Sequence, residues 1–185
     1  MSIALITGST GLVGSQSVSF FSRKGFKVIG IDNNLRKLFF GVDGDTRWIK
    51  KNLESEFKNY EHLNYDIRNF SKLEKIFKKY KKNINLIIHS AAQPSHDWAK
   101  ISPNVDFEVN AKGNLNLLRL TNKFCPDATF IFMSTNKVYG DNPNKLRINE
   151  KKTRYEINNN HKYFKGIDEK MSIDHTTHSL FGASK

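Results

Sequence analysis

Three glycines spaced three apart, Gly8, Gly11 and Gly14, follow the apolar start of the chain in the run TGSTGLVG. Residues without a side chain permit a tight turn, a close approach of the backbone to a pyrophosphate and close packing of the next helix. The first amides of that helix, those of Leu12 and Val13, can donate to phosphate oxygens. The pattern therefore predicts a dinucleotide site.

An acidic residue, Asp32, ends the second apolar run, KVIGID. Its carboxylate can accept hydrogen bonds from both ribose hydroxyls of an adenosine and would repel a 2′-phosphate. This predicts NAD in preference to NADP. Arg36, four positions later, weakens the distinction because a guanidinium could hold that phosphate.

Later apolar runs are also followed by residues suited to a cofactor. Asp66 either accepts the adenine amino group or caps the helix that follows, and one residue could do both. Ala91, Ala92 and Gln93 either lie against the pyrophosphate or nicotinamide ribose, where small side chains let the cofactor approach, or only pack closely. These residues extend the predicted site along the carboxyl ends of several strands.

Three more residues have both a functional and a structural interpretation. Asn110 is either a buried polar residue near the site or an exposed helical asparagine. Trp98 could face a sugar, although a tryptophan in a loop is usually a packing anchor. His89, inside an apolar run, is interpreted as a core histidine with satisfied hydrogen bonds.

The C-terminal run THSLFGASK places an aromatic residue, Phe181, four positions before Lys185. A phenyl ring cannot exchange a proton. An active site that used this pair would therefore lack its acid.

Alternating apolar runs and helical patterns must position these residues. Strands are expected at 2–8, 27–32, 62–66, 85–92 and 128–135, the last as a buried strand, and helices at 12–24, 70–80 and 105–124. This order predicts an α/β, Rossmann-like, doubly wound parallel sheet. The connection 33–60 is expected to be irregular, as is the charged stretch from 140 to 175, which would be functional or disordered.

The charge and cysteine content limit the classes of partner. The net charge is +12, but the lysines are spread along the chain, which favours a solvated surface and an anionic small ligand over nucleic acid. The single cysteine, Cys125, excludes an internal disulfide and offers no metal cluster. With no signal peptide or membrane span expected, the sequence predicts a cytoplasmic protein without membrane or nucleic-acid partners.

The runs TGSTGLVGS, DNN, DIRN, IIHSAAQ, VNAKGNLNLL and STNKVYGD together resemble the extended short-chain dehydrogenase/reductase superfamily, the NAD-dependent epimerases and dehydratases of nucleotide sugars. From STNKVYGD through NEKKTRY to GIDEKMSIDHTTHSLFGASK, the chain is most similar to the CDP-paratose 2-epimerases, also called CDP-tyvelose 2-epimerases. The resemblance covers the whole chain. It implies reversible oxidation of a CDP-sugar or related nucleotide sugar at C2 with NAD.

The resemblance also implies catalytic roles. Thr135 matches the hydroxyl that orients the substrate, Lys185 matches the lysine, and Phe181 occupies the position of the tyrosine base. The full cofactor-binding set that it supports is Gly8, Gly11, Leu12, Val13, Gly14, Asp32, Asn33, Asp66, Ile67, Ala91, Ala92, Gln93, Ser134 and Lys185.

Three explanations of Phe181 remain open. The base is another group, with Asp174, His175 and His178 as local candidates; or the protein binds its ligand without turnover; or this copy is a remnant. The relatives continue past the lysine with further strands and a substrate domain. Residues 1–185 are therefore expected to be the N-terminal NAD-binding portion, inactive alone and able to form a homodimer only in a full-length form. The alternative function is a truncated or non-catalytic NAD-binding domain.

Overall fold

The computed structural model describes residues 2–185 and divides the chain into two compact units. The first unit extends to Met133, and the second is Ser134–Lys185. The first unit contains the glycine turn, and the second contains Thr135, Phe181 and Lys185.

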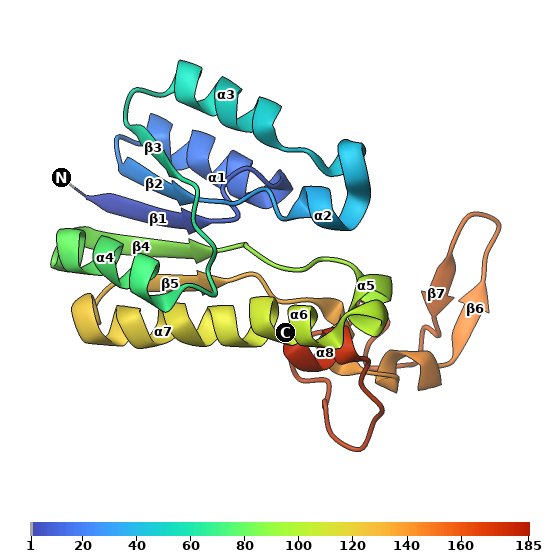
Figure 1. Cartoon of the computed structure of the whole chain (residues 1–185). Coiled ribbons are helices and arrows are strands. Elements are labelled where there is room, and N and C mark those ends of the chain that lie inside the picture. Colours follow the sequence, from blue (N-terminus) through green and yellow to red (C-terminus); the bar gives the residue numbers. More distant parts are fainter. Residues whose placement is uncertain (1) are drawn as a thin grey trace. The chain divides into compact units, whose positions relative to one another are not determined.

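Five parallel strands form the centre of the first unit (Figure 1). Their order in the sheet is β3-β2-β1-β4-β5, with bounds β1 Ile3–Thr7, β2 Lys27–Ile31, β3 Tyr60–Leu63, β4 Ile84–His89 and β5 Thr129–Phe132. All pairings are parallel, and β1 lies between β2 and β4. The predicted α/β, Rossmann-like sheet is confirmed, and its strand order reverses between β1 and β4, where such sheets bind ligands.

Helices cover both faces of this sheet (Figure 1). On one face lie α1 Leu12–Arg23 and α3 Arg47–Glu56, and on the other lie α4 Phe70–Tyr80 and α7 Gly113–Phe124. In α4, Leu73, Ile76 and Phe77 recur at helical spacing and are buried, while the lysines between them face solvent. The helices predicted at 12–24 and 70–80 are therefore confirmed.

The expectation of an irregular connection at 33–60 was wrong. This segment contains α2 Arg36–Phe40, the 3₁₀ turn η1 Gly41–Gly44 and α3. In α3 only Ile49 and Leu53 face the core formed with β1, four residues apart among charged neighbours. So sparse an apolar pattern gives little periodicity to detect.

The segment predicted as one helix at 105–124 is built from several pieces. After β4 come α5 His96–Ile101, α6 Pro103–Phe107, the π-helical turn η3 Glu108–Lys112 and then α7, while the 3₁₀ turn η2 Lys81–Asn83 precedes β4. A π turn adds one residue to the hydrogen-bonded ring and rotates the side chains that follow.

The expectation that β5 is buried was also wrong. Its residues alternate between exposed and half-buried, and Ile131 is 41% exposed. Among the described strands, β5 pairs with β4 alone, so it forms the edge of the sheet.

The second unit has little regular structure. It contains 3₁₀ turns η4 Asn136–Tyr139 and η5 Asn142–Lys145, an antiparallel pair β6 Ile148–Glu150 and β7 Tyr155–Ile157, and the short helix α8 Leu180–Ser184. Tyr163, Met171 and Phe181 are its buried hydrophobic residues among those described. The hairpin was not predicted, but the rest of 140–175 is irregular as expected.

Candidate functional site: a cavity at the carboxyl ends of the strands

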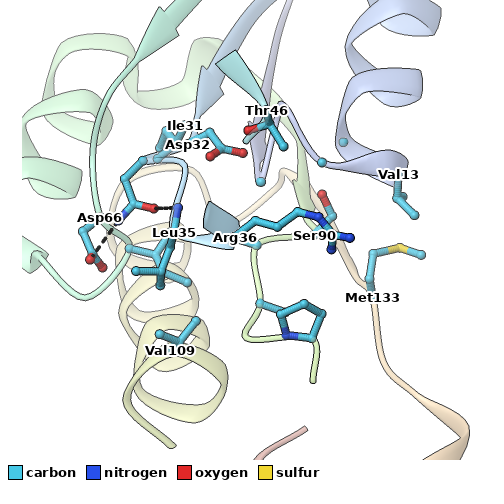
Figure 2. Close-up of a pocket in the computed structure, with 18 of the residues that line it drawn as sticks. Val13, Ile31, Asp32, Leu35, Arg36, Thr46, Asp66, Ser90, Val109 and Met133 are labelled. Atoms are coloured by element: carbon cyan, nitrogen blue, oxygen red, sulfur yellow. Dashed lines mark hydrogen bonds between the residues drawn. The ribbon is translucent and has the colours of Figure 1, made fainter. Parts of the chain in front are cut away.

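A cavity of about 250 Å³ lies beside the carboxyl ends of β1, β2 and β4 (Figure 2). Most of the residues that the sequence predicted to bind the cofactor line this cavity. Its lining is Gly8, Gly11, Leu12, Val13, Gly14, Ile31, Asp32, Asn33, Leu35, Arg36, Thr46, Tyr65, Asp66, Ile67, Ser90, Ala91, Ala92, Pro94, Val109 and Met133. All lie in the first unit.

The glycine turn forms one wall, and its geometry excludes side chains at two positions. Gly8 has φ +67°, and a Cβ there would lie 2.7 Å from the backbone nitrogen of Ala91. A Cβ on Gly14 would lie 1.9 Å from the carbonyl oxygen of Gly8. The turn therefore requires glycine at Gly8 for conformation and at Gly14 for close packing of α1.

The start of α1 is suited to an anion. The first intrahelical bond runs from Ser15 N to Gly11 O (2.9 Å), so the earlier amides of Leu12 and Val13 are not used by the helix. Within residues 2–185, no side chain caps this end, and the first turn has no acidic residue. Backbone amides and the helix dipole together make such an end attractive to phosphate, and the turn fits a pyrophosphate.

Asp32 fixes the shape of the turn as well as lining the cavity. Its Oδ2 accepts from Thr10 N (3.0 Å) and its Oδ1 from Asn34 N (2.7 Å). A carboxylate has about four acceptor positions, so both oxygens retain capacity for ribose hydroxyls. Thr46, which sequence reasoning missed, supports the same corner through its hydroxyl, 2.8 Å from that of Thr10.

Asp66 does not cap the helix that follows it. Asn69 does, because its side chain accepts from Lys72 N (3.0 Å). The Asp66 carboxylate instead accepts from Arg68 Nη2 (2.7 Å) in its own loop. It also accepts from Asn33 Nδ2 (3.0 Å), and this bond joins the loops after β2 and β3. Partial burial opposes ionisation, but the bonds from Arg68 lower the pKa of Asp66.

Of the three residues expected after β4, Ala91 and Ala92 line the cavity and Gln93 is not among the described residues that do. Gln93 is buried, and its side chain donates to Ser95 O (2.7 Å) and Asp106 Oδ1 (2.7 Å). We therefore assign Gln93 a structural role, because its amide is already used inside the protein.

The residues with two interpretations are now placed. Asn110 is buried and bonds the backbone of Gln93, which excludes the exposed alternative. Trp98 donates to Phe39 O (2.8 Å) and is a packing anchor. His89 is a core residue whose Nδ1 lies 2.7 Å from the Thr7 hydroxyl, as expected.

Arg36 lies at the cavity (Figure 2). Its guanidinium is 4.5 Å from the ring centroid of Phe40. Other lining residues that the sequence analysis did not assign to the cofactor are Ile31, Leu35, Tyr65, Ser90, Pro94, Val109 and Met133. Most of them come from separate segments of the chain, so their grouping depends on the fold.

A second, polar cavity shares Asp32, Asn33 and Thr46 with the first and reaches His62 on β3. His62 Nδ1 lies 3.1 Å from Tyr60 Oη. Burial, with a smaller effect of the Lys50 charge, lowers the pKa of His62. The folded protein therefore favours the neutral imidazole.

We expect a corresponding pH dependence of stability. The pKa of His62 is lower in the folded than in the unfolded chain, where it is about 6.5. As the pH falls below that value, the unfolded state binds more protons and the free energy of unfolding decreases. His62→Gln should therefore lose less stability between about pH 7 and pH 5 than the wild type in urea titrations. His96→Gln is the control, and equal losses in His62→Gln and wild type would contradict the expectation.

In the second unit, Thr135 caps η4, and its Oγ1 accepts from Lys137 N (3.3 Å). Turn η4 contacts α8 directly, since a Cβ on Gly182 would lie 2.5 Å from Lys137 O. Helix α8 carries Phe181, which is buried, and Lys185 follows it. The unit therefore brings together the elements of Thr135, Phe181 and Lys185. Ser134 precedes them and is exposed.

In the part of the chain that the structure describes, no group of His, Cys, Asp and Glu side chains could hold a metal ion. Burial raises the pKa of Cys125 to about 11. Across residues 2–185, every helix is too short or too polar to cross a membrane.

Comparisons with known proteins support a dinucleotide site at the glycine turn. The model of the NAD dependent epimerase/dehydratase family matches residues 4–178. CDP-paratose 2-epimerase of Salmonella typhi is 34% identical over 181 residues, which are 98% of this chain and 49% of that protein. UDP-glucose 4-epimerase of Caenorhabditis elegans is 30% identical over 172 residues, with coverage of 92% and 48%. The chain thus spans about half the length of the curated relatives it matches.

The solved structure of the UDP-Glc/GlcNAc 4-epimerase from Campylobacter jejuni has a TM-score of 0.74 at 18% identity and covers 100% of this chain and 46% of that one. At 18% identity, this similarity shows a shared fold and nothing about function. The family match covers nearly the whole chain, and the glycine turn fits a dinucleotide. NAD is confirmed as the cofactor, and the chain belongs to the NAD dependent epimerase/dehydratase family.

Proposed function

We propose that this chain forms the NAD-binding part of a nucleotide-sugar epimerase similar to CDP-paratose 2-epimerase. One observation carries the proposal: the glycine turn, the uncapped start of α1 and Asp32 lie around one cavity. That arrangement suits a pyrophosphate beside a ribose with free hydroxyls.

The cavity residues have distinct roles in this proposal. The amides of Leu12 and Val13 bind the pyrophosphate, and the Asp32 carboxylate accepts from the adenosine ribose. Asn33, Asp66 and Ile67 enclose the adenine, and Ala91 and Ala92 form the wall beside the nicotinamide ribose. NAD supplies the capacity to accept a hydride from a sugar carbinol and to return it.

We propose a CDP-sugar as substrate because the Salmonella typhi relative is a CDP-paratose 2-epimerase. Thr135, with Ser134 beside it, would orient the sugar hydroxyl. Lys185 would donate to the nicotinamide ribose, and its charge would stabilise a nearby oxyanion. A homodimer, formed only by a full-length form, and a cytoplasmic location belong to the same proposal.

A second function, NAD binding without turnover, is favoured by Phe181. Its ring is buried in α8 and has no hydroxyl, so it cannot act as a general base. The two functions share the NAD site and differ in whether sugar is converted.

The NAD site can be tested with the 185-residue protein. We expect calorimetry to show NAD binding and at least a roughly ten-fold weaker affinity for NADP, because Asp32 repels a 2′-phosphate. Asp32→Ala should lower the affinity for NAD by a similar factor, since the ribose loses its acceptor. Asp43→Asn, an exposed acid, is the control. No NAD binding by folded protein, or a preference for NADP, would contradict the proposal.

A further inference from the structure

Asp106 is a buried carboxylate outside the cavity, and nothing in the proposed chemistry uses it. It lies in α6 and is 1% exposed. Its Oδ1 accepts two hydrogen bonds, from Gln93 Nε2 (2.7 Å) and from Asn110 Nδ2 (3.1 Å). Both donors are themselves buried amides. Burial of a carboxylate is costly unless hydrogen bonds compensate for the lost hydration, and here the two amides supply such bonds.

The side-chain amide of Asn110 holds the backbone of the loop that follows β4 and lines the cavity. Its Oδ1 accepts from Gln93 N (2.9 Å), and its Nδ2 donates to Gln93 O (3.2 Å). Both backbone groups of Gln93 are thus bonded to one side chain. Asp106 Oδ1 accepts from the same Nδ2 group and so fixes the orientation of the Asn110 amide.

The side-chain amide of Gln93 bonds the backbone of Ser95, two residues later in the same loop. Its Nε2 donates to Ser95 O (2.7 Å), and its Oε1 accepts from Ser95 N. Pro94 lies in the chain between the two residues that these bonds join, and Pro94, Ala91 and Ala92 line the cavity. The Gln93 amide can make these bonds only in one orientation, which its bond to Asp106 selects.

The local helix geometry agrees with this arrangement. Asn110 lies in the π turn η3, where Val109 lines the cavity while Asn110 faces the loop. A π turn rotates side chains relative to an α-helix and is frequent at functional sites. In η3, the consecutive residues Val109 and Asn110 therefore face different surroundings: Val109 lines the cavity, and Asn110 bonds the loop that supports it.

We propose that Asp106 is a positioning residue for the NAD site, acting through the amides of Gln93 and Asn110 on the wall formed by Ala91, Ala92 and Pro94. This inference rests on the proposed NAD binding. Removal of the carboxylate takes away one acceptor of each amide NH₂ group and leaves another, Ser95 O for Gln93 and Gln93 O for Asn110. The orientation of both amides is then less strictly fixed, and the wall is free to move. The folded protein then binds NAD more weakly.

The test compares three variants of the 185-residue protein by calorimetry with NAD and by thermal unfolding. Asp106→Leu removes the acceptor and should weaken NAD binding roughly ten-fold or more. Asp106→Asn keeps an oxygen at the Oδ1 position and should bind within about three-fold of wild type, as a conservative rescue. Val105→Ala is the control: it lies in α6 and packs on the core, and should lower the unfolding temperature without changing NAD affinity.

Three results would overturn the inference: unchanged NAD affinity in folded Asp106→Leu, equal losses in Asp106→Leu and Val105→Ala, or an Asp106→Asn protein as weak as Asp106→Leu. If Asp106→Leu does not fold, Gln93→Met removes the same contact from the loop side and should also weaken binding roughly ten-fold. Normal affinity in Gln93→Met would then overturn it. Wild-type protein that binds no NAD contradicts the proposed function instead, so the two failures are distinguishable.

Discussion

Phe181→Tyr is expected to raise the rate of CDP-paratose and CDP-tyvelose interconversion by about 10²- to 10⁴-fold, the usual contribution of a general base. The substitution adds a phenol in α8, four residues before Lys185 and on the helix that contacts η4. The ammonium of Lys185 would favour the phenolate. Where the chain is part of a longer protein, turnover is measured with that protein, because residues 1–185 are expected to be inactive alone.

Leu180→Tyr is the matched control, because it adds the same phenol at an exposed position one residue earlier. It should leave the rate unchanged. An increase in Phe181→Tyr alone would support epimerase chemistry with a missing base. Equal rates in wild type and Phe181→Tyr, with measurable turnover in both, would show that another group, such as Asp174, His175 or His178, is the base. No turnover in either would favour NAD binding without catalysis.

Gly14→Ala is expected to lower the free energy of unfolding by about 3 kcal/mol and to abolish measurable NAD binding. The added Cβ would lie 1.9 Å from the carbonyl oxygen of Gly8, so backbone must move. Alanine is favoured over glycine inside a helix by about 1 kcal/mol, which is too little to offset that movement. Urea unfolding and calorimetry with NAD measure the two effects.

Gly11→Ala is the control for this clash within the same turn. Its Cβ would lie 3.3 Å from the same oxygen, and its backbone has φ −76°, which any residue adopts. The loss of stability should stay near 1 kcal/mol, the cost of alanine at a helix N-cap. Equal destabilisation by the two substitutions would show that close packing at Gly14 is not what the turn requires.

The parts of the site that the sequence revealed are those encoded locally. Gly8, Gly11 and Gly14 with Asp32 form one βαβ segment, and the structure places all four at the cavity. Helix α4 was predicted because its apolar residues repeat at helical spacing. Helix α3 was missed because Ile49 and Leu53 are its main core contacts. Burial of β5 was predicted wrongly because it depends on neighbours that a single strand does not specify.

Long-range contacts account for the rest. Thr46 reaches Thr10 across 36 positions, and Gln93 reaches Asp106 across 13. No regular spacing in the sequence predicts such pairs. The position of Gln93, next to Ala91 and Ala92 after a predicted strand, indicated cofactor contact, with close packing as the alternative. The fold instead uses that amide to support the loop, and only the positions of Asp106 and Asn110 reveal this.

The central position of β1 determines when the binding turn can form during folding. Thr7, at the end of β1, bonds His89 across 82 positions, and the next residue, Gly8, is in contact with the backbone of Ala91. Such distant parallel pairing is slow because a long loop must close before any contact compensates its entropy. We therefore expect the turn to reach its final shape only after β4 has joined the sheet. A nascent chain released before that strand is synthesised carries the whole glycine motif and Asp32 but lacks the partner against which the turn is packed.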